Sequence, residues 1–166
     1  MAQYPTTVVN FTAFIDGTSL AGRVTKGVVP NLTLATEEHS AGGMAGTVDV
    51  FTGALEKLEA ELEMAGLSPD FMAGLGRTDF PLTLRGSISD GTAPNSAIYQ
   101  MRGLFRSLET GDFERGNKGM QKIGVTLTYL KVTIAGRELA EADVLGSRLI
   151  IDGRDLMADH RAALGL

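Results

Sequence analysis

The stretch FPLTLRGSIS, residues 80–89, alternates between apolar and polar side chains with a period of two. Phe80, Leu82, Leu84 and Ile88 fall on one face, and Thr83, Arg85, Ser87 and Ser89 fall on the other. Successive side chains of a β-strand point to opposite faces of the sheet, so this pattern predicts a strand with one buried face and one wet face. A chain built from such strands is expected to pack two antiparallel layers around one core.

The same alternation recurs along the chain. Residues 122–129 repeat it, and further strands are predicted at residues 8–15, 28–34, 47–51, 97–106 and 148–151. Turn pairs punctuate these segments at Asp16-Gly17, Asp90-Gly91, Ala135-Gly136 and Asp152-Gly153. Many short strands separated by turns predict a mainly β protein, an antiparallel sandwich or partial barrel. We expect one domain over residues 1–166.

Helices are predicted in two places. Residues 68–76 combine Ser68 at an N-cap position, Pro69 at the first helical position and glycines at the end, which predicts one short α-helix. Residues 156–164 support another turn or two before Gly165. Residues 55–64 are ambiguous, because their composition favours a helix slightly while residues 58–64 alternate as a strand would.

Bulk properties exclude several classes of function. The net charge of −5 provides no surplus of cations for neutralising nucleic-acid phosphates. The absence of cysteine excludes disulfides, thiolate catalysis and sulfur-ligated zinc. The first residues lack the pattern of a signal peptide, and no apolar run approaches the ~18 residues needed to cross a bilayer. We therefore expect neither secretion nor a membrane anchor.

Chemical motifs are missing or incomplete. His39 and His160 have no second ligand at helical spacing, which favours ordinary solvated imidazoles over a metal site. Residues 111–118 resemble a phosphate loop, but Asn117 occupies the place of the required lysine. The glycines at 42, 43 and 46 lack the order that closes on a pyrophosphate. We expect no catalytic residue, no cofactor and no metal, and thus a protein that is not an enzyme.

Short matches in a fixed order carry a resemblance along nearly the whole chain. They comprise residues 10–17 (NFTAFIDG), Ala21-Gly22, Pro30 and Leu32, Thr36-Glu37, Gly42-Gly43-Met44, Arg102-Gly103-Leu104, Gly111-Asp112-Phe113, residues 129–132 (YLKV), Gly136-Arg137-Glu138, Asp143, residues 152–156 (DGRDL) and residues 161–166 (RAALGL). In these pieces, their spacing and the total length, the chain resembles the major tail tube proteins of P2-like contractile phage tails and R-type tailocins. The glutamate-rich residues 58–64 depart from that pattern.

The resemblance implies a β-sandwich or partial barrel with one short helix, forming hexameric rings that stack into a tube inside the contractile sheath. Neighbouring subunits would join their sheets into one closed ring barrel. Implied partners are the sheath, a baseplate or initiator, and a tape-measure protein, while DNA passes through without specific binding. The protein would belong to the virion tail and assemble in the host cytoplasm. The resemblance also favours a strand over residues 58–64.

Two surfaces follow as hypotheses. If residues 58–64 form a strand, Glu59, Glu61 and Glu63 share one face, which we expect to line the lumen and make it negative; the alternative is a solvated face without function. Residues 37–53 are expected to form an assembly loop whose glycines reshape on contact with another subunit; the alternative is a mobile surface loop. The predicted contact residues are Glu37, Glu38, His39, Gly42, Gly43, Met44, Gly46, Leu156, Leu164 and Leu166.

Two other functions share these features. A type VI secretion tube protein has the same implied architecture, although the sequence matches it less well. A monomeric β-barrel that binds a small ligand would show the same alternating strands. Ring or tube formation separates the first two from the third.

Overall fold

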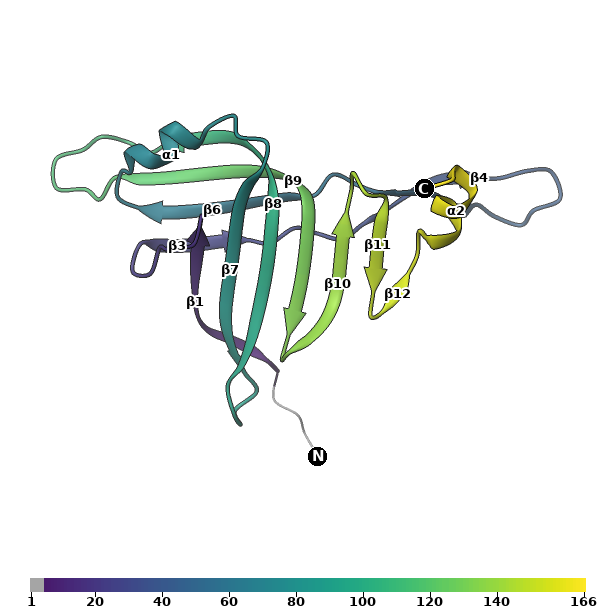
Figure 1. The fold of residues 1–166 in the computed structure, drawn as a ribbon, viewed down its shortest axis with the longest axis horizontal. Coiled ribbons are helices and arrows are strands. Elements are labelled where there is room, and N and C mark those ends of the chain that lie inside the picture. Colours follow the sequence, from purple (N-terminus) through teal and green to yellow (C-terminus); the bar gives the residue numbers. More distant parts are fainter. Residues whose placement is uncertain (1–4) are drawn as a thin grey trace.

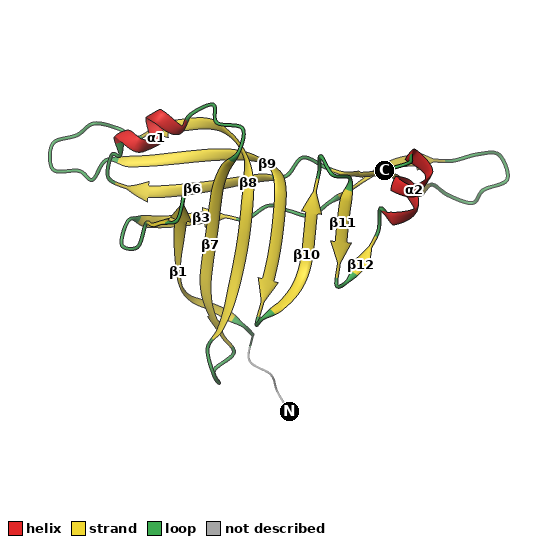
Figure 2. Ribbon diagram, viewed as in Figure 1, coloured by secondary structure: helices red, strands yellow, loops and turns green. Residues whose placement is uncertain are grey.

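Antiparallel strands dominate the computed structural model, which describes residues 5–166; the first four residues of the predicted 1–166 domain lie outside that range (Figures 1 and 2). The strands are β1 (Thr7–Ile15), β2 (Thr18–Ser19), β3 (Val24–Val28), β4 (Leu34–His39), β5 (Val48–Leu55), β6 (Glu59–Ala65), β7 (Phe80–Ser89), β8 (Asn95–Thr110), β9 (Met120–Ile134), β10 (Arg137–Asp143), β11 (Arg148–Ile151) and β12 (Arg154–Asp155). The helices are α1 (Pro69–Gly74) and α2 (Ala158–Leu164). The predicted mainly β class is confirmed.

Ten of the strands belong to one antiparallel sheet that bends into two layers. The long layer follows the order β12-β11-β10-β9-β8-β7-β1-β2. The four-stranded layer consists of β3, β6, residues 120–126 of β9 and residues 104–110 of β8. Because β8 and β9 are long enough to serve both layers, they form the corner of the sandwich, and the strands of the two layers cross steeply (Figure 1).

The corner depends on a glycine. The β8–β9 ladder shifts register between Arg102 and Gly103 and again between Phe105 and Ser107. Such bulges bend a strand and increase its local twist. At the bend, a Cβ placed on Gly103 would lie 2.0 Å from the carbonyl oxygen of Thr126, so no residue with a side chain fits there.

The core lies between the two layers. Its largest fully buried side chains are those of Phe80, Phe105, Leu58, Leu62, Met64, Leu82, Ile123, Leu130 and Val125. In β7 the predicted face is confirmed, because Phe80, Leu82 and Leu84 are buried while Arg85 is exposed. The rings of Phe80 and Phe105 pack with their centroids 4.8 Å apart, joining the start of β7 to the part of β8 beyond the bend.

Residues 59–65 form strand β6, so the slight preference for a helix over residues 55–64 was wrong there and the strand implied by the resemblance is confirmed. Ala60, Leu62 and Met64 are buried, and the glutamates between them face away from the core. Intrinsic helix propensity is worth only a few tenths of a kcal/mol per residue, roughly, and burial of this apolar row outweighs it.

The strand predicted at residues 28–34 was also wrong. β3 ends at Val28 and β4 begins at Leu34, and the intervening segment carries Pro30, which has no N–H to donate to a ladder. Strand β10 was not predicted. The turns at Asp16-Gly17, Ala135-Gly136 and Asp152-Gly153 are confirmed, since both residues of each pair adopt positive φ, as tight hairpins require.

Both helices lie where the sequence placed them. Ser68 is the N-cap residue of α1, but its side chain makes no capping hydrogen bond. Instead its buried backbone N–H donates to Oε1 of Gln121, 2.9 Å away. Helix α2 ends as predicted, with Gly165 in the left-handed conformation at φ 74°.

Candidate assembly surfaces

The arm, which we define as β4, β5 and the turn between them (residues 34–55), projects away from the two layers (Figure 1). Its two strands form a sheet of their own, separate from the ten-stranded sheet. An isolated two-stranded hairpin is at best marginally stable in water. Within this chain the arm is supported at its base, where Phe51 and Leu55 pack against the core.

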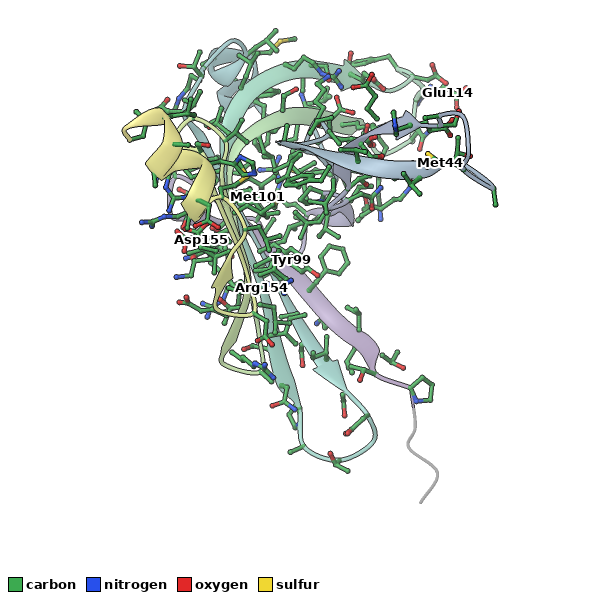
Figure 3. The ribbon with its side chains drawn as sticks, turned by 90° about the vertical axis from the view of Figure 1, so that its right-hand side faces the viewer. Met44, Tyr99, Met101, Glu114, Arg154 and Asp155 are labelled. Carbon is green, nitrogen blue, oxygen red and sulfur yellow. The ribbon has the colours of Figure 1, made fainter. Side chains whose placement is uncertain are left out.

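All the predicted contact residues between 37 and 46 lie on the arm. Glu37, Glu38 and His39 belong to β4 and pair with Val50, Asp49 and Val48. Gly42, Gly43, Met44 and Gly46 form the turn, where a Cβ on any of the three glycines would meet nothing within 4 Å. Figure 3 shows Met44 near the end of the arm. Val48 and Val50 of β5 are also exposed. They were not among the predicted contact residues, although the sequence shows them alternating with Asp49 and Phe51.

The second predicted contact region adjoins the base of the arm. The ring of His160 in α2 meets the ring of Phe51 in β5 edge-on, with centroids 6.5 Å apart. Leu156 packs against the core, whereas Leu164 and Leu166 are exposed. The structure thus brings the two predicted contact regions together at one end of the molecule.

An ion pair holds α2 in place. The Arg161 guanidinium lies 2.5 Å from Oδ2 of Asp155 and also donates to the carbonyl of Ser147 at 2.9 Å. The hydrogen bond from Arg161, followed by that from the Met157 N–H, lowers the pKa of the Asp155 carboxyl below its ordinary value. Asp155 is thus kept ionised at neutral pH with its partners in place.

The three glutamates of β6 do share one face of the four-stranded layer, as expected for a strand. Each is paired with a cation. Glu59 lies 2.6 Å from Lys57 and 3.1 Å from Arg106, Glu61 lies 2.9 Å from Lys122, and Glu63 lies 3.8 Å from Lys26.

These ion pairs change the electrostatics expected of the row. Four cations lie within 4 Å of the three carboxylates, so they reduce the negative potential anticipated from the glutamates alone. The hydrogen bond to Glu61 raises the pKa of Lys122, and the hydrogen bond from Lys57 lowers the pKa of Glu59. The sequence did not reveal Lys26, Arg106 and Lys122 as partners, because they lie on β3, β8 and β9. Lys57 stands two residues before Glu59.

Both edges of the four-stranded layer are open among the described strands. β3 pairs only with β6, and residues 104–110 of β8 pair with no strand other than β9. On that edge only the Phe105 N–H and carbonyl are engaged, by Arg77 and Gly76, which leaves residues 107–110 open. Strand directions alternate across the layer, so β3 and β8 run antiparallel to one another. An exposed strand edge is a template for pairing with another chain.

Among residues 5–166 no three His, Asp or Glu side chains cluster closely enough to hold a metal ion. None of the described helices is long and apolar enough to cross a membrane.

Comparisons with known proteins identify the family of this chain. The sequence model of the family described as phage tail tube protein FII matches residues 5–165. The chain belongs to this family. It is 30% identical to the tail tube protein of Escherichia phage P2 over 161 residues, which cover 92% of this chain and 93% of that protein. It is 29% identical to the major tail tube protein of Serratia phage KSP20, covering 94% of each.

Solved structures share the fold at lower sequence identity. A chain from the sheath–tube complex of an extracellular contractile injection system has a TM-score of 0.60 at 13% identity, covering 78% of this chain and 92% of that one. A chain from the tube-terminating cap of the anti-feeding prophage has a TM-score of 0.62 at 14% identity, covering 81% and 95%. Family membership confirms the tail tube prediction over the type VI secretion tube and the ligand-binding barrel.

Proposed function

We propose that this protein is the repeating structural subunit of the inner tube of a contractile tail, and that six copies form each ring. The observation that carries the proposal is the pair of open edges on the four-stranded layer. Because β3 and the second half of β8 run antiparallel, β3 of one copy can extend the layer at β8 of the next without reversing any strand. Repeated around an axis, this heterologous contact closes a barrel and removes both edges.

The polar face of the four-stranded layer then lines the lumen. Its opposite face is buried against the long layer, so only the side bearing Glu59, Glu61 and Glu63 can face the channel. The ion pairs supply a lining whose cations are already engaged by carboxylates. DNA or a tape-measure protein passing through would meet few free cations to bind its acidic groups.

The arm and the C-terminal residues supply contacts beyond the barrel. We propose that Glu37, Glu38, His39, Gly42, Gly43, Met44 and Gly46 meet the next ring or a neighbouring subunit, with Leu156, Leu164 and Leu166 beside them. An arm without its own core becomes ordered by that contact, which restricts tube growth to an existing ring. The sheath covers the outside and the baseplate initiates the tube, with assembly in the bacterial cytoplasm and no catalytic step.

Size-exclusion chromatography of the purified chain followed by negative-stain microscopy tests the proposal. Rings or hollow tubes are the expected result. A chain that stays monomeric across a wide range of concentration and carries a bound small molecule would overturn it.

A further inference from the structure

The long layer overhangs the four-stranded layer. Beyond β3, the inner face of β1, β7, β8 and β9 continues without a second layer above it, and an apolar groove of about 610 Å³ opens there. Val8, Phe11, Val29, Ile88, Tyr99 and Ile134 are among the residues that line it. Figure 3 shows the Tyr99 side chain in this open half, pointing away from the long layer. The sandwich of a single copy is thus unfinished on the β3 side.

The opposite margin of the sandwich carries an exposed apolar surface. There, α1 and the two residues after Leu75 lie against β8 at Phe105: the Gly76 N–H donates to the Phe105 carbonyl at 3.0 Å, and the Phe105 N–H donates to the Arg77 carbonyl at 2.9 Å. Phe71 is buried beneath the helix, but Met72 is 61% exposed and Leu75 is 48% exposed. Two apolar side chains therefore face outward on the β8 side.

Edge pairing brings these two surfaces together. When β3 of one copy pairs with β8 of the next, as the proposed ring requires, the α1 that lies along that β8 arrives beneath the overhang of the first copy. We propose that α1 of each copy occupies the groove of its neighbour, with Met72 and Leu75 against Tyr99 and Phe11. The inference rests on the proposed ring and names the contact that completes each subunit's core.

Two observations favour a second copy as the occupant. The groove and α1 lie on opposite margins of the same layer, so the contact is heterologous. Each copy inserts its own α1 into one neighbour and accommodates the α1 of the other. The groove continues directly from the β3 edge, because Thr25, Lys26 and Gly27 are among its lining residues.

A pair of introduced cysteines tests the contact directly, because the native chain has none. The double variant Met72→Cys with Tyr99→Cys is assembled and then treated with a mild oxidant or a short bis-maleimide. We expect a ladder of covalent oligomers on a non-reducing gel, ending at the ring size. The matched pair, Met72→Cys with Leu145→Cys, uses a residue that is 84% exposed on the β10–β11 turn and should give no ladder.

The outcomes separate the inference from the proposed function. If rings form normally and the Met72–Tyr99 pair gives no ladder, α1 does not occupy the groove while the tube proposal stands. If the unmodified chain forms no rings under any condition, both are overturned.

A charge substitution provides the second test. Met72→Glu should leave the monomer folded, because the side chain is already mostly in water, but should reduce ring assembly at least tenfold by placing a carboxylate in an apolar groove. Leu145→Glu is the control and should assemble as the native chain does. Unchanged assembly of Met72→Glu overturns the inference.

Discussion

Gly103 and Thr126 meet at the bend of the sandwich so closely that a Cβ on the glycine would lie 2.0 Å from the threonine carbonyl oxygen. The opposing atom is backbone, which cannot rotate aside as a side chain could. We predict that Gly103→Ala forces β8 and β9 apart and lowers the free energy of unfolding by about 3 kcal/mol or more. Urea unfolding of the monomer, followed by circular dichroism, measures the change.

Gly42→Ala is the matched control for that substitution. A Cβ at Gly42 meets nothing within 4 Å, and its φ is not in the positive region. Its unfolding midpoint should stay within error of the native chain. A Gly103→Ala chain that is equally stable would show that the bend can relax.

The hydrogen bond from the Ser68 N–H to Gln121 provides the second test of stability. Gln121 is 3% exposed and accepts the buried Ser68 N–H at the start of α1. Gln121→Leu leaves that donor without its partner, which we expect to cost about 1–3 kcal/mol. Gln100→Leu, an exposed glutamine on β8, should change the unfolding free energy by less than about 0.5 kcal/mol. Similar losses in both variants would contradict this role for Gln121.

The Asp155–Arg161 pair predicts an acid-sensitive C-terminal helix. The folded-state pKa of Asp155 is lowered, so its contribution to stability is present at neutral pH and is lost as the pH falls through that lowered pKa. Asp155→Asn should therefore loosen α2 at neutral pH, and the difference from the native chain should disappear in strong acid. Limited proteolysis of α2 across pH follows this, with Asp159→Asn as the control. A difference that persisted unchanged into strong acid would exclude the ionised carboxylate as the cause.

The arm predicts a change in amide exchange on assembly. In the monomer its two strands hydrogen-bond only to each other, and beyond the base of the arm their residues are exposed, so residues 37–48 should exchange quickly. In assembled tubes we expect marked protection there, while the buried strand β6 should be protected in both states. Equal exchange of the arm in monomer and tube would mean that it is a mobile surface loop.

Strand periodicity was enough to predict the sheet but not its bend. The alternation of β7 identifies its buried face in the sequence, because one face meets the core along most of the strand. For β8 and β9, the two bulges beyond Arg102 shift which residues face inward, and a period-2 pattern cannot reveal them. β6 shows the opposite problem, since its glutamates favour a helix when tertiary contacts are ignored.

The candidate surfaces were predictable only where their signal is local. The glycines of the arm and the glutamates of β6 stand close together in the sequence. Three of the four cations that pair with those glutamates do not, because Lys26, Arg106 and Lys122 reach them through strand pairing. Likewise, Met72 and Tyr99 carry no individual mark of an interface, and only the unequal extent of the two layers singles them out.

The unfinished half of the sandwich has a consequence for how this protein's stability should be expressed. If each subunit lends its helix to the next, part of every hydrophobic core is intermolecular. Dilution then removes core contacts as surely as heating does, and the melting temperature must rise with protein concentration. A tube of such subunits should withstand temperatures at which its isolated subunits unfold.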